Sequence, residues 1–136
     1  MDLYDFTIIG SGPTGLFAGF YSGMRNMRTK IIEALPEVGG QLTVLYPEKF
    51  IYDSPGYPKV LAKDLVKNLH EQTNMFNPLF CFNERVKMIE TMSDNIIKIE
   101  TNKTTHFTKN LLISAGIGAF EPNKLLLNWA KNNNGK

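Results

Sequence analysis

The sequence predicts an α/β fold in which a parallel sheet carries flanking helices and an antiparallel β-meander. Residues 6–20, FTIIGSGPTGLFAGF, pass from a buried strand through three glycines into a helix, and a second short strand, TKIIEA, follows. Residues 86–107 alternate between apolar and polar side chains, which is typical of antiparallel strands. The chain has 136 residues, of which 43% are hydrophobic, so it is long enough for one globular domain with a sizeable core.

The N-terminal part predicts two strands, a helix and a long loop. Residues 3–9 are apolar on both faces, as are buried strands of parallel sheets. Residues 13–27 indicate a helix, and residues 29–34, TKIIEA, contain the second strand. Residues 34–60 have no sustained period and are dense in glycine and proline, so we expect a long ordered loop. The apolar residues at helical spacing in the helix are Leu16, Phe17, Phe20 and Met24.

The C-terminal part returns to regular structure. Residues 61 to about 76 have helical spacing, and PLFCF, residues 78–82, predicts a strand. The alternating residues 86–107 predict the meander, and NLLISAG, residues 110–116, predicts a further buried strand. In the helix the apolar positions are Leu61, Leu65, Leu69 and Phe76, and the solvent-facing ones include Lys63, Lys67 and Glu71.

Charge and composition exclude several classes of function. Fifteen Lys and Arg against thirteen Asp and Glu leave a net charge of +2 without a basic stripe, which argues against nucleic-acid binding. The apolar runs are too short for a membrane span, and Asp2 and Asp5 break a signal-peptide pattern, so we expect a cytoplasmic protein. The single cysteine, Cys81, excludes an internal disulfide or a CxxC pair in this chain, and its apolar neighbours predict a buried, inert thiol.

The glycines form a GxGxxG fingerprint between strand and helix. Gly10 permits the tight turn, Gly12 lets the backbone approach a pyrophosphate, and Gly15 lets helix and strand pack closely. Pro13 suits the first helical turn, where an N–H group is not needed. The free N–H groups of that turn and the positive end of the helix dipole predict a phosphate site. A turn that merely connects two elements is the alternative.

Glu33 closes the second strand 18 residues after Gly15. Dinucleotide sites place an acid at roughly this spacing, about 20 residues on, to bind the ribose hydroxyls of adenosine. A carboxylate there would repel a 2′-phosphate, which disfavours NADP at this particular site. The alternative is a solvated surface charge.

The loop over residues 34–60 favours FAD over NAD as the dinucleotide. Its 27 residues far exceed the few that usually connect a strand to its helix. Gly39, Gly40 and Gln41 can bring backbone and an amide against a cofactor, and Tyr46 offers a ring face. Such an apolar loop suits a long cofactor with a flat ring system, although it could instead simply pack over the core.

The motifs GSGPTG, EALPEVGGQLTVLYPEKFIYDSPGYP and LLISAGIGAFEP resemble the FAD-binding part of thioredoxin-reductase-like flavoproteins, most closely the type 2 ferredoxin–NADP reductases of bacteria. The resemblance covers nearly the whole chain and implies a Rossmann-like FAD/NAD(P)-binding fold. Thioredoxin reductases share a similar GGQL loop but typically lack the YPEK segment. The residues that this resemblance implies as FAD contacts are Thr14, Glu33, Gln41, Tyr46, Val86 and Phe120. It implies that Tyr46 stacks on the isoalloxazine and that Val86 meets the adenine end, whereas sequence pattern alone reads Val86 and Phe120 as core.

The resemblance implies hydride transfer from NADPH to FAD and then electron transfer to ferredoxin, in a homodimer. Members of the family carry a second dinucleotide domain for NADPH and a returning stretch that completes the FAD domain, and neither follows Lys136 here. We therefore expect an incomplete FAD-binding domain at 1–122, a polar tail at 123–136, and no reductase activity from this chain alone. A thioredoxin-reductase-like disulfide reductase segment and a non-catalytic FAD- or nucleotide-binding fragment are the alternatives.

No residue set predicts a catalytic acid and base or a metal site. His70 falls on a helix face and His106 in a hairpin, and both are expected to be solvated. The chemistry is therefore expected to belong to the flavin, which the protein holds and tunes.

Overall fold

The computed structural model describes residues 1–118, and their central feature is a mixed sheet in the strand order β5-β2-β1-β8-β7-β6. The first four of these strands are parallel, and the last three form an antiparallel meander. The strands are β1 (Leu3–Ile9), β2 (Thr29–Ile32), β3 (Phe50–Ile51), β4 (Val60–Leu61), β5 (Leu79–Cys81), β6 (Val86–Thr91), β7 (Ile97–Thr101) and β8 (Thr105–Ile113). The helices are α1 (Pro13–Met24), α2 (Gln41–Val44) and α3 (Ala62–Asn74). The predicted fold class is confirmed.

Strand β8 joins the parallel and antiparallel parts of the sheet. Its N-terminal half pairs antiparallel with β7, for example Ile99 with His106, and its C-terminal part runs parallel to β1, with Ile9 beside Ile113. The sequence predicted a meander ending at 107 and a separate strand at 110–116. One continuous strand replaces both, because β8 stays paired with β1 on both sides of Lys109, from Phe107 to Ile113.

Helix α1 packs on the sheet through its small residues. Its buried positions are Gly15, Leu16, Gly19, Ser22 and Gly23, whereas Phe17 and Met24 are about half exposed. A Cβ added to Gly19 would lie 2.9 Å from side-chain atoms of both Ile31 and Thr73, so a larger residue there would separate the helix from β2 and α3. The helix predicted over residues 13–27 is confirmed and ends at Met24. Of its four large apolar residues at helical spacing, Leu16 is buried, Phe20 is half-buried, and Phe17 and Met24 are exposed. The close approach of the backbones selects small residues at the contact with the sheet and α3.

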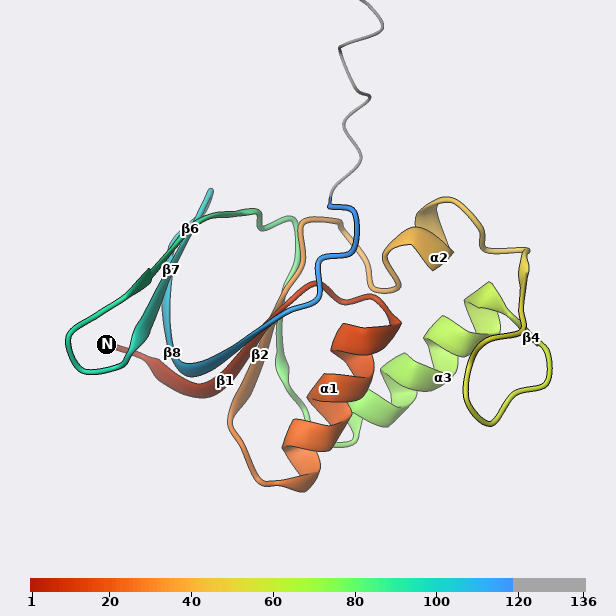
Figure 1. Cartoon of the computed structure of the whole chain (residues 1–136), viewed down its shortest axis with the longest axis horizontal. Coiled ribbons are helices and arrows are strands. Elements are labelled where there is room, and N and C mark those ends of the chain that lie inside the picture. The colour runs from red at the N-terminus through yellow and green to blue at the C-terminus, as the bar shows by residue number, and fades with distance from the viewer. Residues whose placement is uncertain (119–136) are drawn as a thin grey trace, which may run out of the picture.

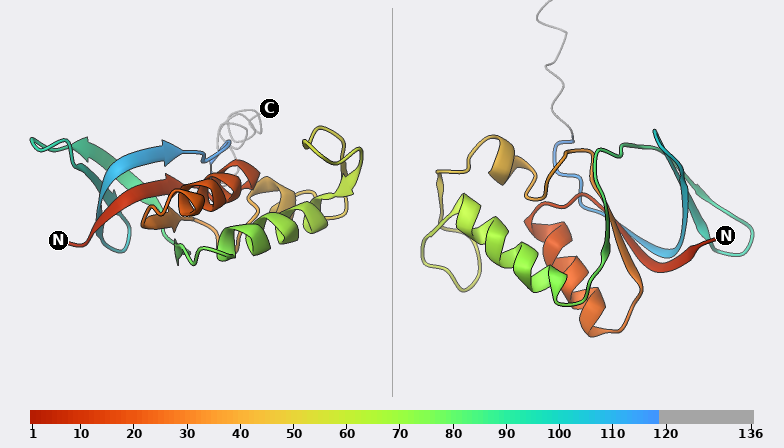
Figure 2. Two further views of the ribbon diagram at one scale, coloured as in Figure 1. Left: turned by 90° about the horizontal axis from the view of Figure 1, so that it is seen from below. Right: turned by 180° about the vertical axis from the view of Figure 1, so that it is seen from behind.

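Helices α1 and α3 lie side by side (Figures 1 and 2). The buried Thr73 hydroxyl donates to the carbonyl of Leu16 at 2.7 Å and fixes the two helices together. Leu65 and Val66 are buried, while Lys63, Lys67 and Glu71 face solvent as predicted. Burying a side chain such as Leu65 stabilises the fold by roughly 1.5–3 kcal/mol. The helices described for residues 1–118 are too short or too polar to cross a bilayer.

The segment expected to be an irregular loop, residues 34–60, contains short regular elements. It holds the single turn α2 and the strand β3, which pairs antiparallel with β4. In Figure 1 the part around β4 lies at the opposite end of the molecule from the meander. The carboxyl ends of β1, β2 and β8 lead to the edge of the sheet where α2 is found, which places the loop beside the glycine turn.

Candidate functional site

An open cleft of about 1510 Å³ runs along the carboxyl edge of the parallel strands. It is larger than the roughly 300–1,000 Å³ typical of sites for small ligands, which suits an extended molecule. The sequence-predicted residues that line it are Gly10, Gly12, Pro13, Thr14, Glu33, Gly39, Gly40, Gln41, Tyr46 and Val86. The fold thus brings together residues from β1, α1, β2, the long loop and β6. Phe120 lies outside the described residues.

The glycine turn divides into packing positions and one open position. Gly10 has φ of +100°, a conformation that favours glycine, and an added Cβ would collide with the carbonyl group of Ser114. Gly15 is buried, and a Cβ there would collide with the carbonyl oxygen of Gly10. An added Cβ at Gly12 would meet no atom within 4 Å, so this backbone faces free space in the cleft. Gly10 and Gly15 therefore occupy the turn and packing positions expected of the fingerprint, and the phosphate role of Gly12 stays a prediction.

The N-terminus of α1 is suited to an anion. Gly12 is the N-cap, Pro13 is the first helical residue, and the first turn contains no acidic side chain. The N–H groups of this turn have no partner within the helix, and the helix dipole adds positive potential. Gly40 lies close by, since a Cβ added to it would be 3.5 Å from the Cα of Gly12. Backbone from both sides therefore surrounds the place where a phosphate would bind.

Glu33 is a buried acid held in a fixed position, which rules out the solvated-charge alternative. Only 7% of Glu33 is exposed. Its Oε2 accepts hydrogen bonds from the backbone N–H and the hydroxyl of Ser11, at 2.8 and 2.7 Å. Its Oε1 accepts one from the N–H of Leu35 at 2.9 Å. A carboxylate offers about four acceptor sites, so capacity remains for a hydroxyl in the cleft.

The long loop presents aromatic rings to the cleft. Tyr46, Phe50, Tyr52 and Tyr57 are 37–66% exposed and line it. The N–H of Gly39 donates to the carbonyl of Ser11 at 2.8 Å, which fixes the loop to the glycine turn, and no residue of α2 is buried. The ammonium of Lys49 lies 4.9 Å from the centre of the Tyr46 ring. The rings that line the cleft are thus exposed, whereas the buried Gly39 packs against Val66 of α3.

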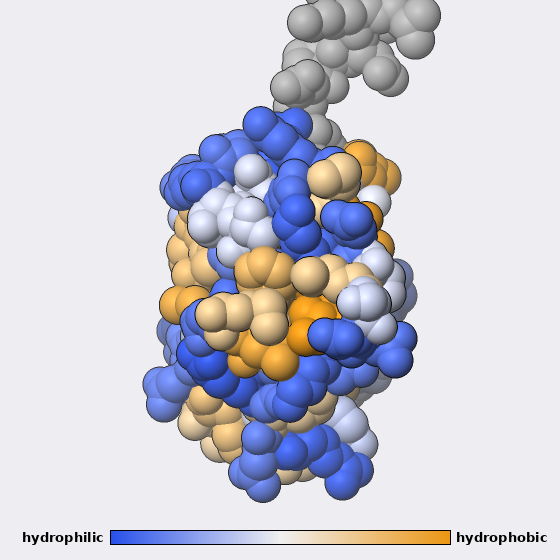
Figure 3. Space-filling view, turned by 90° about the vertical axis from the view of Figure 1, so that its left-hand side faces the viewer, coloured by the Kyte–Doolittle hydropathy of each residue, from blue (hydrophilic) through white to orange (hydrophobic). Residues whose placement is uncertain are grey.

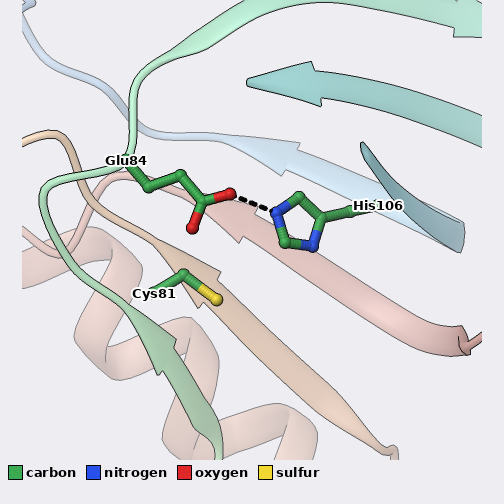
Figure 4. Close-up of side chains that lie close together, drawn as sticks. All are labelled: Cys81, Glu84 and His106. Atoms are coloured by element: carbon green, nitrogen blue, oxygen red, sulfur yellow. Dashed lines mark hydrogen bonds and ion pairs between the residues drawn. The ribbon is translucent and has the colours of Figure 1, made fainter. Parts of the chain in front are cut away.

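A second polar group lies on the face of the sheet away from α1. The carboxylate of Glu84 faces the ring of His106, and the Cys81 thiol lies beside them (Figure 4). Nε2 of His106 is 2.5 Å from Oε1 of Glu84, and both residues are about 6% exposed. The expectation that His106 is solvated is wrong, because His106 shares the inward face of β8 with Thr108. The alternation of buried and exposed residues along this strand was the sequence signal that could have predicted the burial of His106.

Burial and hydrogen bonding shift the pKa values in this group. Desolvation alone would raise the pKa of Glu84, but hydrogen bonds from His106 and Thr101 outweigh it and lower that pKa. Burial lowers the pKa of Lys30, whose Nζ lies 2.9 Å from Nδ1 of His106. Burial also raises the pKa of the half-buried Cys81 thiol, which keeps it protonated and unreactive. His70, expected to be solvated, is half-buried and meets the ring of Phe80 edge-on.

Donor atoms of Cys81, Glu84 and His106 lie within 4.8 Å of one another, a spacing that could suit a metal ion. The neighbouring Lys30 argues against a metal ion at this position. A metal-binding histidine donates its second ring N–H to an acceptor, whereas here that nitrogen faces the Lys30 ammonium, which is itself a donor. We therefore interpret the group as an ion network.

The parallel sheet, the glycine turn, the acid after β2 and the antiparallel meander together define the dinucleotide-binding α/β fold of flavoprotein reductases. Thioredoxin reductase of Streptococcus pyogenes superposes with a TM-score of 0.71 at 30% identity, over 82% of this chain and 34% of that one. The Lactococcus lactis enzyme gives 0.74 at 28% identity, over 88% of this chain and 38% of that one.

Curated relatives are more similar in sequence than these solved structures. A protein named ferredoxin–NADP reductase 2 from Bacillus cytotoxicus is 54% identical over 130 residues, which are 96% of this chain and 40% of that protein. A ferredoxin–NADP reductase of Geobacillus thermodenitrificans is 50% identical over 135 residues, or 99% and 41%. No protein-family model matches the sequence. The chain spans about 40% of the length of these curated relatives, and it is homologous to a segment of the ferredoxin–NADP reductases. The resemblance inferred from the motifs is thereby confirmed.

Proposed function

We propose that this chain supplies the FAD-binding part of a reductase that transfers electrons from NADPH through FAD to ferredoxin. The observation that carries the proposal is the single cleft that joins the open glycine turn, the buried acid and the aromatic loop. The names of the relatives support NADP and ferredoxin as donor and acceptor. They also favour this function over a disulfide reductase, because the thioredoxin reductases are less similar in sequence, at 28–30%.

The residues present fit FAD from end to end. The N-terminus of α1 suits the pyrophosphate, and Glu33 suits a ribose hydroxyl of the adenosine. Adenine would then lie toward Val86, which lines the same cleft. At the other end, Gln41 and Tyr46 offer an amide and a ring face. Because Glu33 would repel a 2′-phosphate, we assign NADPH to a different part of the whole protein.

Bound FAD supplies the hydride and electron chemistry, and the chain binds and orients it. The amides of α1 stabilise the phosphate charge, and Glu33 fixes the adenosine by accepting a charge-assisted hydrogen bond. Tyr46 excludes water from one face of the isoalloxazine and sets its plane. We assign no catalytic acid or base to this chain.

Titration of FAD into the purified 136-residue chain, followed by flavin fluorescence, tests the proposal. We expect saturable quenching of the flavin fluorescence. The affinity for FAD should be lower in Tyr46→Leu. It should be unchanged in Tyr21→Leu, since Tyr21 is half exposed on α1 outside the cleft. We expect no NADPH oxidation by the chain alone. Saturable binding of NAD without binding of FAD would contradict the proposal.

A further inference from the structure

Three charged or polar side chains from distant segments form a buried chain that reaches the cleft at Glu84, one of the residues that line it. Lys30 comes from β2, His106 from β8, and Glu84 from the connection between β5 and β6. Each is 4–7% exposed. Lys30 Nζ lies 2.9 Å from His106 Nδ1, and His106 Nε2 lies 2.5 Å from Glu84 Oε1. The ring of Tyr4 covers the Lys30 ammonium at 3.9 Å from its centre.

We assign the protons in this chain by taking Lys30 as an ammonium group. An ammonium group can only donate, so in this assignment Nδ1 of His106 accepts from Lys30 and carries no proton. Nε2 then carries the ring proton and donates to Glu84. A neutral imidazole therefore connects a buried ammonium with a buried carboxylate, and each charge is compensated through the ring. Thr101 adds a further hydrogen bond to the same Oε1 of Glu84 at 2.7 Å.

The carboxylate end of this chain is attached to the wall of the cleft. The backbone N–H of Glu84 donates to the carbonyl of Glu33 at 2.9 Å, and the N–H of Glu33 donates to the carbonyl of Cys81 at 2.8 Å. The main chain of Glu33 is thus held between Cys81 and Glu84. Two residues beyond Glu84, Val86 lines the cleft. Any shift of residue 84 would therefore move both sides of the adenosine end.

We propose that Lys30, His106 and Glu84 form a relay of positioning residues that holds Glu33 and Val86 in the geometry needed to bind adenosine. The inference rests on the proposed function, because it concerns the same cleft. The relay residues act through the backbone of residues 81–86. Because they act at the adenosine end of the cleft, they should change the affinities for FAD and for ADP equally. ADP shares adenosine and pyrophosphate with FAD but has no flavin.

Binding of FAD and of ADP to charge-removing variants tests the relay. Lys30→Met leaves the carboxylate without its ammonium, and Glu84→Gln leaves the ammonium without its carboxylate. We expect each variant to lower the affinities for FAD and for ADP by the same factor, on the order of tenfold. The double variant removes both charges and should regain most of the affinity. Lys98→Met, which breaks a partly exposed pair with Glu100 on β7, is the matched control.

Two comparisons separate positioning from general destabilisation. Tyr46→Ala should lower the affinity for FAD and leave the affinity for ADP unchanged, whereas the relay variants should lower both affinities. Affinities are measured at a temperature where circular dichroism shows each variant folded. If Lys30→Met and Glu84→Gln bind ADP as tightly as the parent, the relay inference is overturned while the proposed function stands. If the parent binds neither FAD nor ADP, both fail.

The ring proton of His106 provides a test that needs no relay variant. Nitrogen-15 NMR of the parent chain at neutral pH should show the neutral tautomer with its proton on Nε2, assigned by comparison with His70→Gln. A proton on Nδ1, or an imidazolium, would overturn the relay, because neither can accept from Lys30.

Discussion

At the residue scale, the site depends on one carboxylate and one open backbone position. Glu33 is fixed by three hydrogen bonds from Ser11 and Leu35, so its orientation toward the cleft is set before any ligand binds. Gly12 faces the cleft with free space where a side chain would be. Each makes a different prediction.

Replacing Glu33 with alanine should lower the affinity for FAD by about 10- to 100-fold, because a charge-assisted hydrogen bond contributes about 1.5–3 kcal/mol. ADP should lose affinity to the same extent. Glu37→Ala, an exposed acid four residues away, is the control and should change nothing. Equal retention of FAD by the Glu33→Ala variant and the parent on dialysis would contradict the ribose role.

Two alanine substitutions in the fingerprint should separate binding from folding. Gly12→Ala fits the backbone, whose φ of −68° and ψ of −177° suit any residue, so the melting temperature should not change. Its methyl group would occupy phosphate space, and FAD affinity should fall by about tenfold or more. Gly15→Ala would collide with Gly10 and should destabilise the fold by about 1–3 kcal/mol. Thermal unfolding that reverses this order would refute the assignment.

The sequence predicted these residues because their signals are local. A glycine turn, and an acid at a fixed spacing from it, can be read within about 20 residues. Lys30 and His106 were not predicted as partners, since 76 residues separate them and only the pairing of β8 with β1 brings them to one face. The local sequence pattern predicts individual strands but not which strands pair or in which register.

At the scale of elements, the connection from β5 to β6 links the parallel sheet to the meander. Residues 82–86 are also held by the turn between β7 and β8, since Asn102 accepts from the N–H of Arg85 at 2.7 Å and Lys103 donates to the carbonyl of Phe82 at 2.8 Å. The meander was predictable from its alternation. The exposure of Phe17 and Met24 was not, because helical spacing shows which residues share a face and not which face packs.

Glu84 should make this connection sensitive to acid. Its folded-state pKa is lowered below the ordinary value of 4.5, so its stabilisation is present above that pH and is lost as the pH falls through the folded-state pKa. Glu84→Gln cannot lose this contribution. Urea unfolding at pH 7 and at about pH 3 should therefore show a smaller acid-induced loss of stability in Glu84→Gln than in the parent. Glu71→Gln, an exposed change on α3, should behave as the parent does. Parallel losses in Glu84→Gln and the parent would contradict this.

At the scale of the whole molecule, residues 1–118 leave apolar surface and strand edge exposed. Beyond Thr108, β8 pairs with β1 and has no strand on its other side within the described part of the chain. Figure 3 shows apolar patches between hydrophilic residues at the meander end, where β6 and its following turn expose Met88, Ile89 and Met92. Unpaired strand edges and apolar patches favour association between copies.

We predict concentration-dependent self-association of the chain in sedimentation velocity. Ile113→Lys places a charge on the free part of β8, at a residue that is 63% exposed, and should reduce association. Ile117→Lys, at a residue that is 74% exposed beyond the strand, should not. A monomer at all concentrations would show that this edge is not used.

The most direct test of the central claim is an amide NMR titration of the folded chain with FAD. We predict saturable shifts that are largest for the backbone N–H groups of Gly12, Thr14 and Gly15 at the start of α1 and of Ser11 and Leu35 around Glu33. Tyr46 should shift with FAD but not with ADP. Shifts confined to other surfaces, or no saturation by either ligand in the folded chain, would contradict the assignment of this cleft to FAD.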